Sequence, residues 1–479
     1  MGEGEMSEVG TREAYARLEP SYLQRYFPTV YTAAVTVFLI NFALGVPTTA
    51  LADLLKYKVA APTALLFWAQ LAILGMGKAI ADLVGGYFLD RWHNGRRKVM
   101  IVGTVLVIIG SLMIWTTFPD LHQTAVDTIR KAVTGKKHAP LPAFDIAPFL
   151  LIMGGQFLNG FGIGMQNGAA MVLLQDYGGA TKRGLGASLQ KFSLYGGKTT
   201  ATYLGALLGA VTGLVLFPFL FVGVLAVLAM VLNIVLIKDS REAVLIPAGV
   251  ERKQPTLADY KPAFTNRSLY SVYFVAFMGK WSDSWFQSIS LLYLLLLSYT
   301  KVEVGAIAAA FGVLWSVLNA YSGWFSDFFG RRRLALAGTA MGVATPLLFL
   351  WFANGPKNVS LGIVLAALWG FGTGVYYGIT EVVPGDVARL ASRGAIIGTF
   401  RFFRDTGNVI VPLIFAGILL LPRQQFGSEI NLYGLTLWAT AIMMLITFGV
   451  VWFVMRETFV PSPPAEEAVV AAPRPATAG

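Results

Sequence analysis

The chain has no cysteine and only three histidines, and this scarcity excludes several kinds of protein. Without cysteine there is no disulfide framework and no thiolate metal site. The histidines share no ligand spacing, and no glycine-rich tract continues into the GK[ST] sequence of a nucleotide-binding loop. No other enzyme signature is present. We therefore predict that the chain is not an enzyme and has no metal site and no cofactor.

Charge is also scarce, whereas apolar residues are abundant. Of 479 residues only 13% are charged and 56% are hydrophobic, and the mean hydropathy is +0.63. A soluble core cannot hide this much apolar surface, so the lipid bilayer must be a partner of the chain. The net charge of +11 is attributed to membrane topology, and nucleic acid is not expected as a partner.

Apolar runs of about 20 residues predict membrane-spanning helices, because backbone groups in hydrocarbon must be satisfied within the segment. The first run is too long for a cleaved signal and follows a polar segment. An even number of spans returns both termini to one side. The sequence thus predicts an all-α membrane protein with twelve spans, at about 28–54, 62–89, 99–118, 148–173, 184–209, 214–237, 269–297, 303–326, 334–353, 359–383, 396–420 and 431–455.

The distribution of Lys and Arg predicts the orientation. Of the 37 basic residues, 22 fall in segments on the side of the N-terminus and 9 on the other side. This excess predicts cytoplasmic N- and C-termini in the cell (inner) membrane. Four of the nine lie in the loop at 119–148, which we interpret as a surface amphipathic helix.

Two sequence patterns occur twice and indicate a duplicated unit. A glycine followed by an aspartate and a basic turn occurs at 86–98 and again at 323–333. The pattern GFGxGxxxG begins at Gly160 and again at Gly370, a separation of 210 residues. The same separation relates Asp176 to Asp386, Arg183 to Arg393, and Lys191 to Arg401. These spacings predict two copies of a six-helix unit.

With both charged turns, both glycine runs and the basic stretch 238–268, the chain resembles the major facilitator superfamily from about residue 25 to 456. The resemblance implies two pseudo-symmetric six-helix bundles that rock about a central cavity, which gives alternating access. We expect the bundles at 28–237 and 269–456. Around them we expect cytoplasmic segments at 1–27 and 238–268 and a disordered cytoplasmic tail at 457–479.

The charged turns are candidates for a gate. Asp90 and Asp327 are placed to meet a helix N-terminus or an arginine of the opposite bundle, a contact that strengthens when water is excluded. The resemblance implies the same latch role for Arg91, Arg96 and Arg97. An alternative for these arginines is that they only anchor the chain at the inner leaflet. We interpret the glycine runs as structural helix packing.

Ionisable side chains within the spans are costly and are candidates for function. Lys78 and Asp82 are four residues apart, so as structural residues they either neutralise each other or pair with the opposite bundle, and a role in transport is the alternative. Lys78, Arg401 and Arg404 are assigned to the gate. Arg401 and Arg404 lie close to the inner end of their span, where they are expected to line the gate. Apart from Asp53 and Glu303 at the ends of their spans, there are six cations and four carboxylates: Lys78, Lys191, Lys198, Lys280, Arg401, Arg404, Asp82, Asp283, Glu381 and Asp405.

Lys280 and Asp283 fall near the middle of the span 269–297 and are the first candidates for substrate binding. The resemblance implies a cavity lined by the first, fourth, seventh and tenth helices. A lysine among amides and tyrosines suits a small polar or anionic solute. Proton coupling would require a buried carboxylate, and the candidates are Glu381, Asp283 and Asp82. The other polar residues of these helices are Asn41, Gln156, Asn159, Gln166, Asn167, Gln287, Tyr376 and Tyr377.

These residues favour a monomeric secondary transporter for a small polar or anionic solute, energised by gradients. A multidrug efflux antiporter remains an alternative, although Gln156 stands where an arginine often lies in proton-coupled relatives and the span 184–209 contains no proline. Aromatic residues, at 13%, would suit its apolar cavity. A second alternative is a non-transporting receptor built on a transporter fold.

Overall fold

The computed structural model describes residues 21–45, 63–116, 146–179, 182–212, 217–247, 256–388, 393–421 and 429–458, and these residues form helices with no strand among them. The long helices are α2 (Phe27–Gly45), α4 (Thr63–Arg91), α5 (Gly95–Thr116), α7 (Ile146–Gly178), α8 (Arg183–Thr212), α9 (Phe217–Val235), α11 (Arg267–Ser284), α13 (Lys301–Phe329), α14 (Arg331–Ala353), α15 (Val359–Thr380), α17 (Arg393–Leu419) and α19 (Glu429–Phe453).

The all-helical membrane fold is confirmed. Eight helices of the described residues are long and apolar enough to cross a membrane. Each of the twelve predicted apolar runs overlaps one long helix, so the predicted count is consistent with the structure. The predicted amphipathic helix in the loop 119–148, most of the segment 1–27 and nearly all of the tail 457–479 lie outside the described residues.

Polar residues fix the starts of several helices. The Thr300 side chain accepts a hydrogen bond from the Glu303 backbone N–H, and the Glu303 carboxylate accepts one from Thr300 N–H, which forms a capping box before α13. Asn266 and Asn358 cap α11 and α15 with their side-chain oxygens. Between α13 and α14, Gly330 has a φ of 86°, a conformation that favours glycine, and the chain reverses there.

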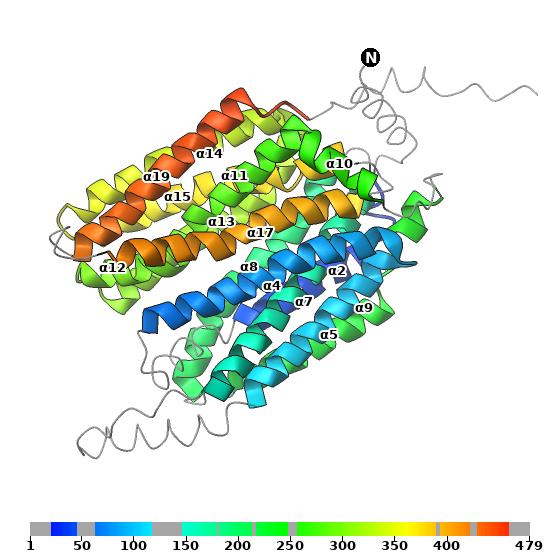
Figure 1. Cartoon of the computed structure of the whole chain (residues 1–479), viewed down its shortest axis with the longest axis horizontal. Coiled ribbons are helices and arrows are strands. Elements are labelled where there is room, and N and C mark those ends of the chain that lie inside the picture. The colour runs from blue at the N-terminus through cyan, green and yellow to red at the C-terminus, as the bar shows by residue number, and fades with distance from the viewer. Residues whose placement is uncertain are drawn as a thin grey trace, which may run out of the picture.

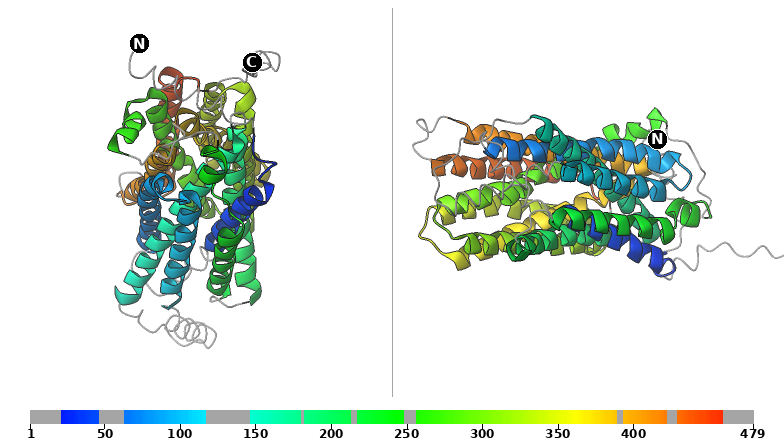
Figure 2. Two further views of the ribbon diagram at one scale, coloured as in Figure 1. Left: turned by 90° about the vertical axis from the view of Figure 1, so that its right-hand side faces the viewer. Right: turned by 90° about the horizontal axis from the view of Figure 1, so that it is seen from below.

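The described helices lie in two groups, with helices of each group nearly parallel to the long axis of the molecule (Figures 1 and 2). The N-terminal helix group contains α2, α4, α5, α7, α8 and α9, and the C-terminal helix group contains α11 to α19. Two helix pairs join the groups, because α4 packs along α17 and α8 packs along α13. The groups match the expected bundles in content, while the boundaries 28–237 and 269–456 stay a prediction.

The duplicated glycine runs pack helices within each group. A Cβ at Gly160 of α7 would overlap the carbonyl oxygen of Leu74 in α4. At the equivalent position in α15, a Cβ at Gly370 would overlap the carbonyl oxygen of Phe311 in α13. Only glycine permits this backbone approach. The runs therefore have a structural role in this conformation, in line with their interpretation from the sequence.

The predicted continuous span 269–297 is interrupted. α11 ends at Ser284, a π-helical turn η2 (Trp285–Ile289) follows, and α12 (Ser290–Leu296) completes the run. A π turn adds a residue to the helical repeat and is frequent at functional sites. It comes directly after Lys280 and Asp283. Three further short helices are η1 (Arg241–Leu245), α10 (Leu257–Thr265) and α16 (Val383–Val387).

Both charged turns lie at one end of the molecule, which we call the charged-turn end. The first described residues reach it, because Tyr22 N–H donates to the Tyr177 carbonyl at the end of α7. The last described residues reach it too, because Glu457 accepts hydrogen bonds from the backbone N–H groups of Arg331 and Arg332. The two ends of the described chain therefore share one side, as an even number of spans requires.

Candidate functional site

Three buried ion pairs join the two helix groups. Arg401 Nε lies 2.7 Å from Asp82 Oδ1. Lys78 Nζ lies 3.0 Å from Asp405 Oδ2, and Lys191 Nζ lies 2.5 Å from Glu381 Oε1. In each pair one charged side chain belongs to the N-terminal helix group and its partner belongs to the C-terminal helix group. The two helix groups are therefore held together by charge as well as by apolar packing.

Lys78 and Asp82 thus take partners from the opposite group instead of each other. Their positions on α4 face α17, where Asp405 and Arg401 stand at the same four-residue spacing. Of the two interpretations that the sequence left open, the structure has the cross-group one. Lys78 keeps 14% of its side chain exposed, whereas its partner Asp405 is fully buried.

Arg404 links two of these pairs into one network. Its Nε and Nη2 atoms lie 2.8 and 2.6 Å from the two carboxylate oxygens of Asp405, and its Nη1 atom donates to Glu381. This is the bidentate geometry that makes arginine–carboxylate pairs strong. Glu381 therefore binds both Arg404 and Lys191, and Asp405 binds both Arg404 and Lys78.

Lys280 and Asp283 form a fourth pair, with Nζ 2.9 Å from Oδ2. Lys280 packs against Gly407 of α17 and lies over the Tyr377 ring, 5.2 Å from its centroid. The charges of Lys198 and Lys78 act on Asp283, and that of Arg404 acts on Lys280. The pair is therefore continuous with the network around Arg404.

These six cations and four carboxylates thus belong to one cluster, which we call the central charge cluster. Six cations against four carboxylates leave it with a net formal charge of +2. Arg401 keeps two donors in reserve, since neither Nη1 nor Nη2 has a hydrogen-bond partner in the described part of the chain. An excess of buried positive charge attracts an anion.

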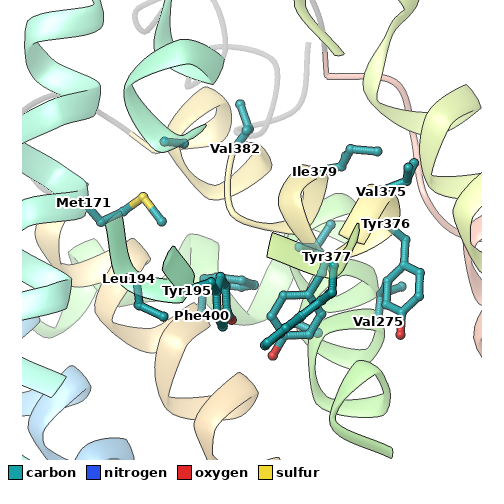
Figure 3. Packing of buried hydrophobic residues seen from close by; sticks show 14 of the residues in the cluster. Met171, Leu194, Tyr195, Val275, Val375, Tyr376, Tyr377, Ile379, Val382 and Phe400 are labelled. Atoms are coloured by element: carbon teal, nitrogen blue, oxygen red, sulfur yellow. The ribbon is translucent and has the colours of Figure 1, made fainter. Parts of the chain in front are cut away.

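An aromatic layer packs against the cations of the central charge cluster. It consists of Tyr195, Trp315 and Tyr377, with the first two ring centroids 4.0 Å apart and the last two 6.3 Å apart. Lys191 lies 5.6 Å from the Tyr195 ring centroid. Figure 3 shows Tyr195 and Tyr377 among the buried residues that fill the space between α8 and α15. The layer combines cations with aromatic faces.

The amides proposed for substrate binding lie mostly in contacts within the N-terminal helix group. Asn41 donates to Asn167 at 3.1 Å, and Gln166 donates to the Thr36 carbonyl. Asn159 accepts from Ser111 of α5 at 3.3 Å. Gln156 is buried in α7. These contacts hold α2 and α5 against α7, and a role in binding solute stays a prediction.

The remaining proposed binding residues differ in position. Tyr376 points into the C-terminal helix group, where its hydroxyl donates to Met444 Sδ at 3.8 Å. Tyr377 belongs to the aromatic layer, and its buried hydroxyl has no partner among the described residues. The side chain of Gln287 lies outside the described residues. The three proton-coupling candidates, Asp82, Asp283 and Glu381, each pair with a cation of the central charge cluster.

Both aspartates of the charged turns meet the first turn of a helix from the opposite group. Asp90 accepts a hydrogen bond from Ala395 N–H in the first turn of α17, at 2.9 Å. Asp327 faces Gly184 in the first turn of α8, where a Cβ would crowd its carboxylate. Asp327 also pairs with Arg331 at 2.7 Å. An unpaired helix N-terminus favours such carboxylates.

Among the arginines of the first charged turn (86–98), Arg96 is the one whose contacts fit the predicted gating role. It is buried, lies 3.5 Å from Asp90, and donates to the Leu89 carbonyl. Arg97 instead contacts the end of α9, through the Ile234 carbonyl and Asp239. Arg91 is exposed and contacts Tyr87 of its own helix. The anchoring alternative therefore suits Arg91 better than Arg96.

Two clasps at the charged-turn end were not assigned a gating role from the sequence. Asp176 pairs with Arg393 across the groups and with Arg96 within its own group. Asp386 pairs with Arg183 across the groups at 3.4 Å and with Arg331 at 3.0 Å. The repeat at 210 residues was the signal that could have identified them.

Hydroxyl groups from the segments after the last helix of each group complete the clasps. Ser240 donates to Asp176 at 2.8 Å, and Thr458 donates to Asp386 at 3.3 Å. The acidic residue before each hydroxyl, Asp239 or Glu457, accepts from backbone N–H at the start of the helix after a charged turn. The pseudo-symmetry of the chain thus extends to both gate clasps.

Comparison with known proteins gives one family and a set of folds. Residues 30–412 and 269–478 match the sequence profile of the Major Facilitator Superfamily. No curated protein sequence matches the chain. Among solved structures, the human organic anion transporter MFSD10 (TETRAN) superposes with a TM-score of 0.66 at 13% identity, over 89% of this chain and 99% of that one. At this identity the likeness shows the fold alone.

A bacterial homologue of the iron transporter ferroportin, in an outward-facing state with soaked iron, gives a TM-score of 0.64 at 12% identity. The match covers 88% of this chain and 98% of the homologue. A second structure of this homologue, also in the outward-facing state, gives a TM-score of 0.66 at 11% identity over the same shares. Within the described residues, no group of three or more His, Cys, Asp or Glu side chains is arranged to hold a metal ion.

Proposed function

The chain belongs to the Major Facilitator Superfamily and is a membrane transporter, and we propose that it is a monomeric secondary active transporter for a small polar solute that carries negative charge. The observation that carries this proposal is the central charge cluster. It lies at the interface of the two helix groups, and its formal charge is +2.

Electrostatics favour an anion at this position. Two unit charges 4 Å apart attract by about 4 kcal/mol at the effective dielectric constant of about 20 that suits partly buried sites. A solute anion therefore compensates the unbalanced cations, whereas a cation adds to the excess. The human structural neighbour transports organic anions, which agrees with this class. The charge balance disfavours a metal cation such as iron.

We also propose that the charged-turn end faces the cytoplasm and is closed in this conformation, so the solute would enter from the opposite side. The excess of Lys and Arg on the N-terminal side supports this orientation. The contacts of Asp90 with Ala395 and of Asp176 with Arg393 support closure. Opening this end by alternating access would require the cross-group pairs to separate.

Proton coupling would use one of the paired carboxylates Asp82, Asp283 and Glu381. Asp82 and Glu381 each face a cation of the opposite group, from which they would part if the groups separated. Asp283 faces Lys280 of its own helix, from which it would part if the solute took the place of one of them. The aromatic layer keeps multidrug efflux as the second candidate, because stacked rings also suit flat apolar cations.

Purified protein in proteoliposomes tests these proposals. Uptake of small anions and of cationic dyes should be measured with and without an imposed proton gradient. Saturable anion uptake supports the proposed function, and stimulation by the gradient supports coupling. Proton-driven dye movement without anion uptake would favour efflux. Binding without flux of any compound would favour the receptor alternative.

A further inference from the structure

The guanidinium of Arg401 is a buried cation with an open edge. Its side chain has 0% exposure, and its Nε lies 2.7 Å from Asp82 Oδ1. Its Nη1 and Nη2 atoms have no hydrogen-bond partner within the described residues. Leaving donors of a buried charged group unpaired is costly, so such an arrangement indicates a missing acceptor.

Arg404, three residues along the same helix, provides the contrast. Nε and Nη2 bind the two oxygens of Asp405, and Nη1 binds Glu381. All three of its nitrogen atoms are thus engaged. Arg401 is therefore the arginine of the central charge cluster that has donors to spare.

The free donors define the shape of the acceptor. Because Asp82 occupies the Nε side, the open edge of Arg401 is the one between Nη1 and Nη2. This edge presents two parallel N–H bonds, which match the two oxygens of a planar carboxylate. A tetrahedral oxyanion can also bind this fork through two oxygens, but its third oxygen then requires a further donor.

Gly168 leaves room beside this arginine. A Cβ at Gly168 of α7 would lie 3.6 Å from Arg401 Nε and 3.6 Å from Asp82 Oδ1, an ordinary contact distance. At the equivalent Gly378 of α15, a Cβ would overlap Ser322 Oγ and the Asn319 carbonyl. Close packing thus requires glycine at Gly378 but not at Gly168. The absence of a side chain at Gly168 therefore leaves space beside Arg401.

The aromatic layer supplies an apolar surface near this site. Tyr195 and Tyr377 lie four residues, about 6 Å of helix, from Lys191 and Glu381 respectively. Trp315 Nε1 and the Tyr377 hydroxyl are buried donors without partners among the described residues. A solute with a carboxylate at one end and a flat ring at the other would use both features.

We propose that Arg401 binds the carboxylate of the transported solute and that the solute is an aromatic monocarboxylate. This inference rests on the proposed function and makes it more specific. It assigns Arg401, which the sequence placed in the gate, to substrate recognition. When the two helix groups separate, Arg401 would lose Asp82, and the bound carboxylate would then be its partner.

Three probes of similar size distinguish the two properties that the site should recognise, the negative charge of the solute and the planar geometry of its carboxylate. Benzoate is a planar anion, benzenesulfonate is a tetrahedral anion, and benzamide is planar and neutral. Binding to the purified full-length protein in detergent should be measured by tryptophan fluorescence, and uptake should be measured in proteoliposomes. We expect benzoate to bind most tightly, benzenesulfonate more weakly, and benzamide least.

The variants distinguish the contribution of the paired Nη donors of Arg401 from the contribution of its positive charge. Arg401→Lys keeps a cation opposite Asp82 but removes the paired Nη donors, and we expect benzoate affinity to fall by about tenfold or more, and by a larger factor than benzenesulfonate affinity. Arg333→Lys is the matched control, because Arg333 is exposed at the start of α14. Gly168→Val tests the site independently, since its added methyl groups would crowd Arg401 Nε and Asp82 Oδ1.

The outcomes distinguish the two proposals. Equal benzoate binding by the parent protein, Arg401→Lys and Gly168→Val would overturn the role of Arg401, even if anion transport is observed. Preference of the parent protein for benzenesulfonate would overturn the carboxylate class and leave anion transport standing. If no anion is taken up or bound, the proposed function fails and this inference fails with it.

Discussion

Asp176 and Asp386 lie 210 residues apart in the sequence, and each binds the arginine that begins a helix of the opposite group. The first clasp uses Arg393 at the start of α17, and the second uses Arg183 at the start of α8. One duplicated contact thus closes the charged-turn end on both sides of the pseudo-symmetry axis. Its two copies are different in burial, because Asp176 is fully buried and Asp386 is not.

Removing one clasp should shift the molecule toward opening at this end. Asp176→Asn deprives Arg393 and Arg96 of their shared carboxylate, so the closed state loses charged contacts that the open state does not need. Because the chain contains no cysteine, Ser188→Cys at the α8–α13 contact provides a single reporter thiol. We expect a membrane-impermeant maleimide, added from the charged-turn side, to label this thiol faster in the Asp176→Asn variant than in the protein with an intact clasp.

Glu303→Gln is the control for this experiment, since its pair with Lys357 is partly exposed and lies at the opposite end of α13. Asp386→Asn should act in the same direction as Asp176→Asn, with a smaller effect because it is less buried. Equal labelling rates in the Asp176 and Glu303 variants would contradict the gating role of the clasp.

Lys280→Ala should reduce uptake of the best anionic solute. The substitution removes one of the cations in excess and leaves Asp283 buried beside Lys198 and Lys78. The loss of a charged hydrogen bond of ~1.5–3 kcal/mol corresponds to a decrease of about tenfold or more. Initial uptake rates in proteoliposomes check this expectation.

The double variant Lys280→Ala/Asp283→Ala is the matched control, because it restores the net charge of the cluster. We expect it to recover part of the lost uptake. Unaltered uptake by Lys280→Ala would show that this lysine does not face the solute.

The pair of Lys78 with Asp405 should be asymmetric in its effect on stability. Asp405→Asn removes the carboxylate that the fully buried Arg404 shares with Lys78, and we expect the free energy of unfolding to fall by about 3–5 kcal/mol. Lys78→Met leaves Asp405 with its bidentate partner Arg404 and removes a partly exposed lysine, so a loss of about 1 kcal/mol or less is expected. Thermal unfolding in detergent should rank the two variants, and the reverse order would refute the central position of Asp405.

Gly160→Ala should destabilise the N-terminal helix group. The added Cβ overlaps the Leu74 carbonyl, and forcing α7 away from α4 costs about 1–3 kcal/mol. Gly305→Ala is the control, because a Cβ there meets no atom within 4 Å among the described residues. In that exposed helix position, alanine should leave the unfolding temperature unchanged or raise it. Similar unfolding temperatures for the two variants would argue against close packing at Gly160.

Much of the fold could be predicted from the sequence because the bilayer imposes a length on each apolar run. The duplication could also be predicted, since the glycine pattern that begins at Gly160 is repeated at Gly370. In the structure both glycines allow close approach to the backbone of a neighbouring helix. The contact of Asp90 with the first turn of an opposite helix followed from the physics of helix ends. The π turn after Ser284 was not predictable, because residues 285–289 have no proline or glycine to mark it.

The candidate site was less accessible to sequence reasoning. A spacing of four residues shows that Lys78 and Asp82 share a face, but the facing helix decides their partners. Likewise, a polar residue in a span does not reveal which neighbour it meets, so the contact of Asn159 with Ser111 could not be predicted. The six cations and four carboxylates of the central charge cluster could be identified from the sequence, whereas their convergence required the tertiary structure.

The sign of the transported charge tests the central claim most directly. Initial uptake rates of benzoate and of its neutral isostere benzamide should be compared in proteoliposomes and in protein-free liposomes. We predict saturable, protein-dependent uptake of the anion that exceeds protein-dependent uptake of the amide. Protein-dependent uptake of neutral or cationic compounds, with none for any of a panel of small anions, would contradict the account.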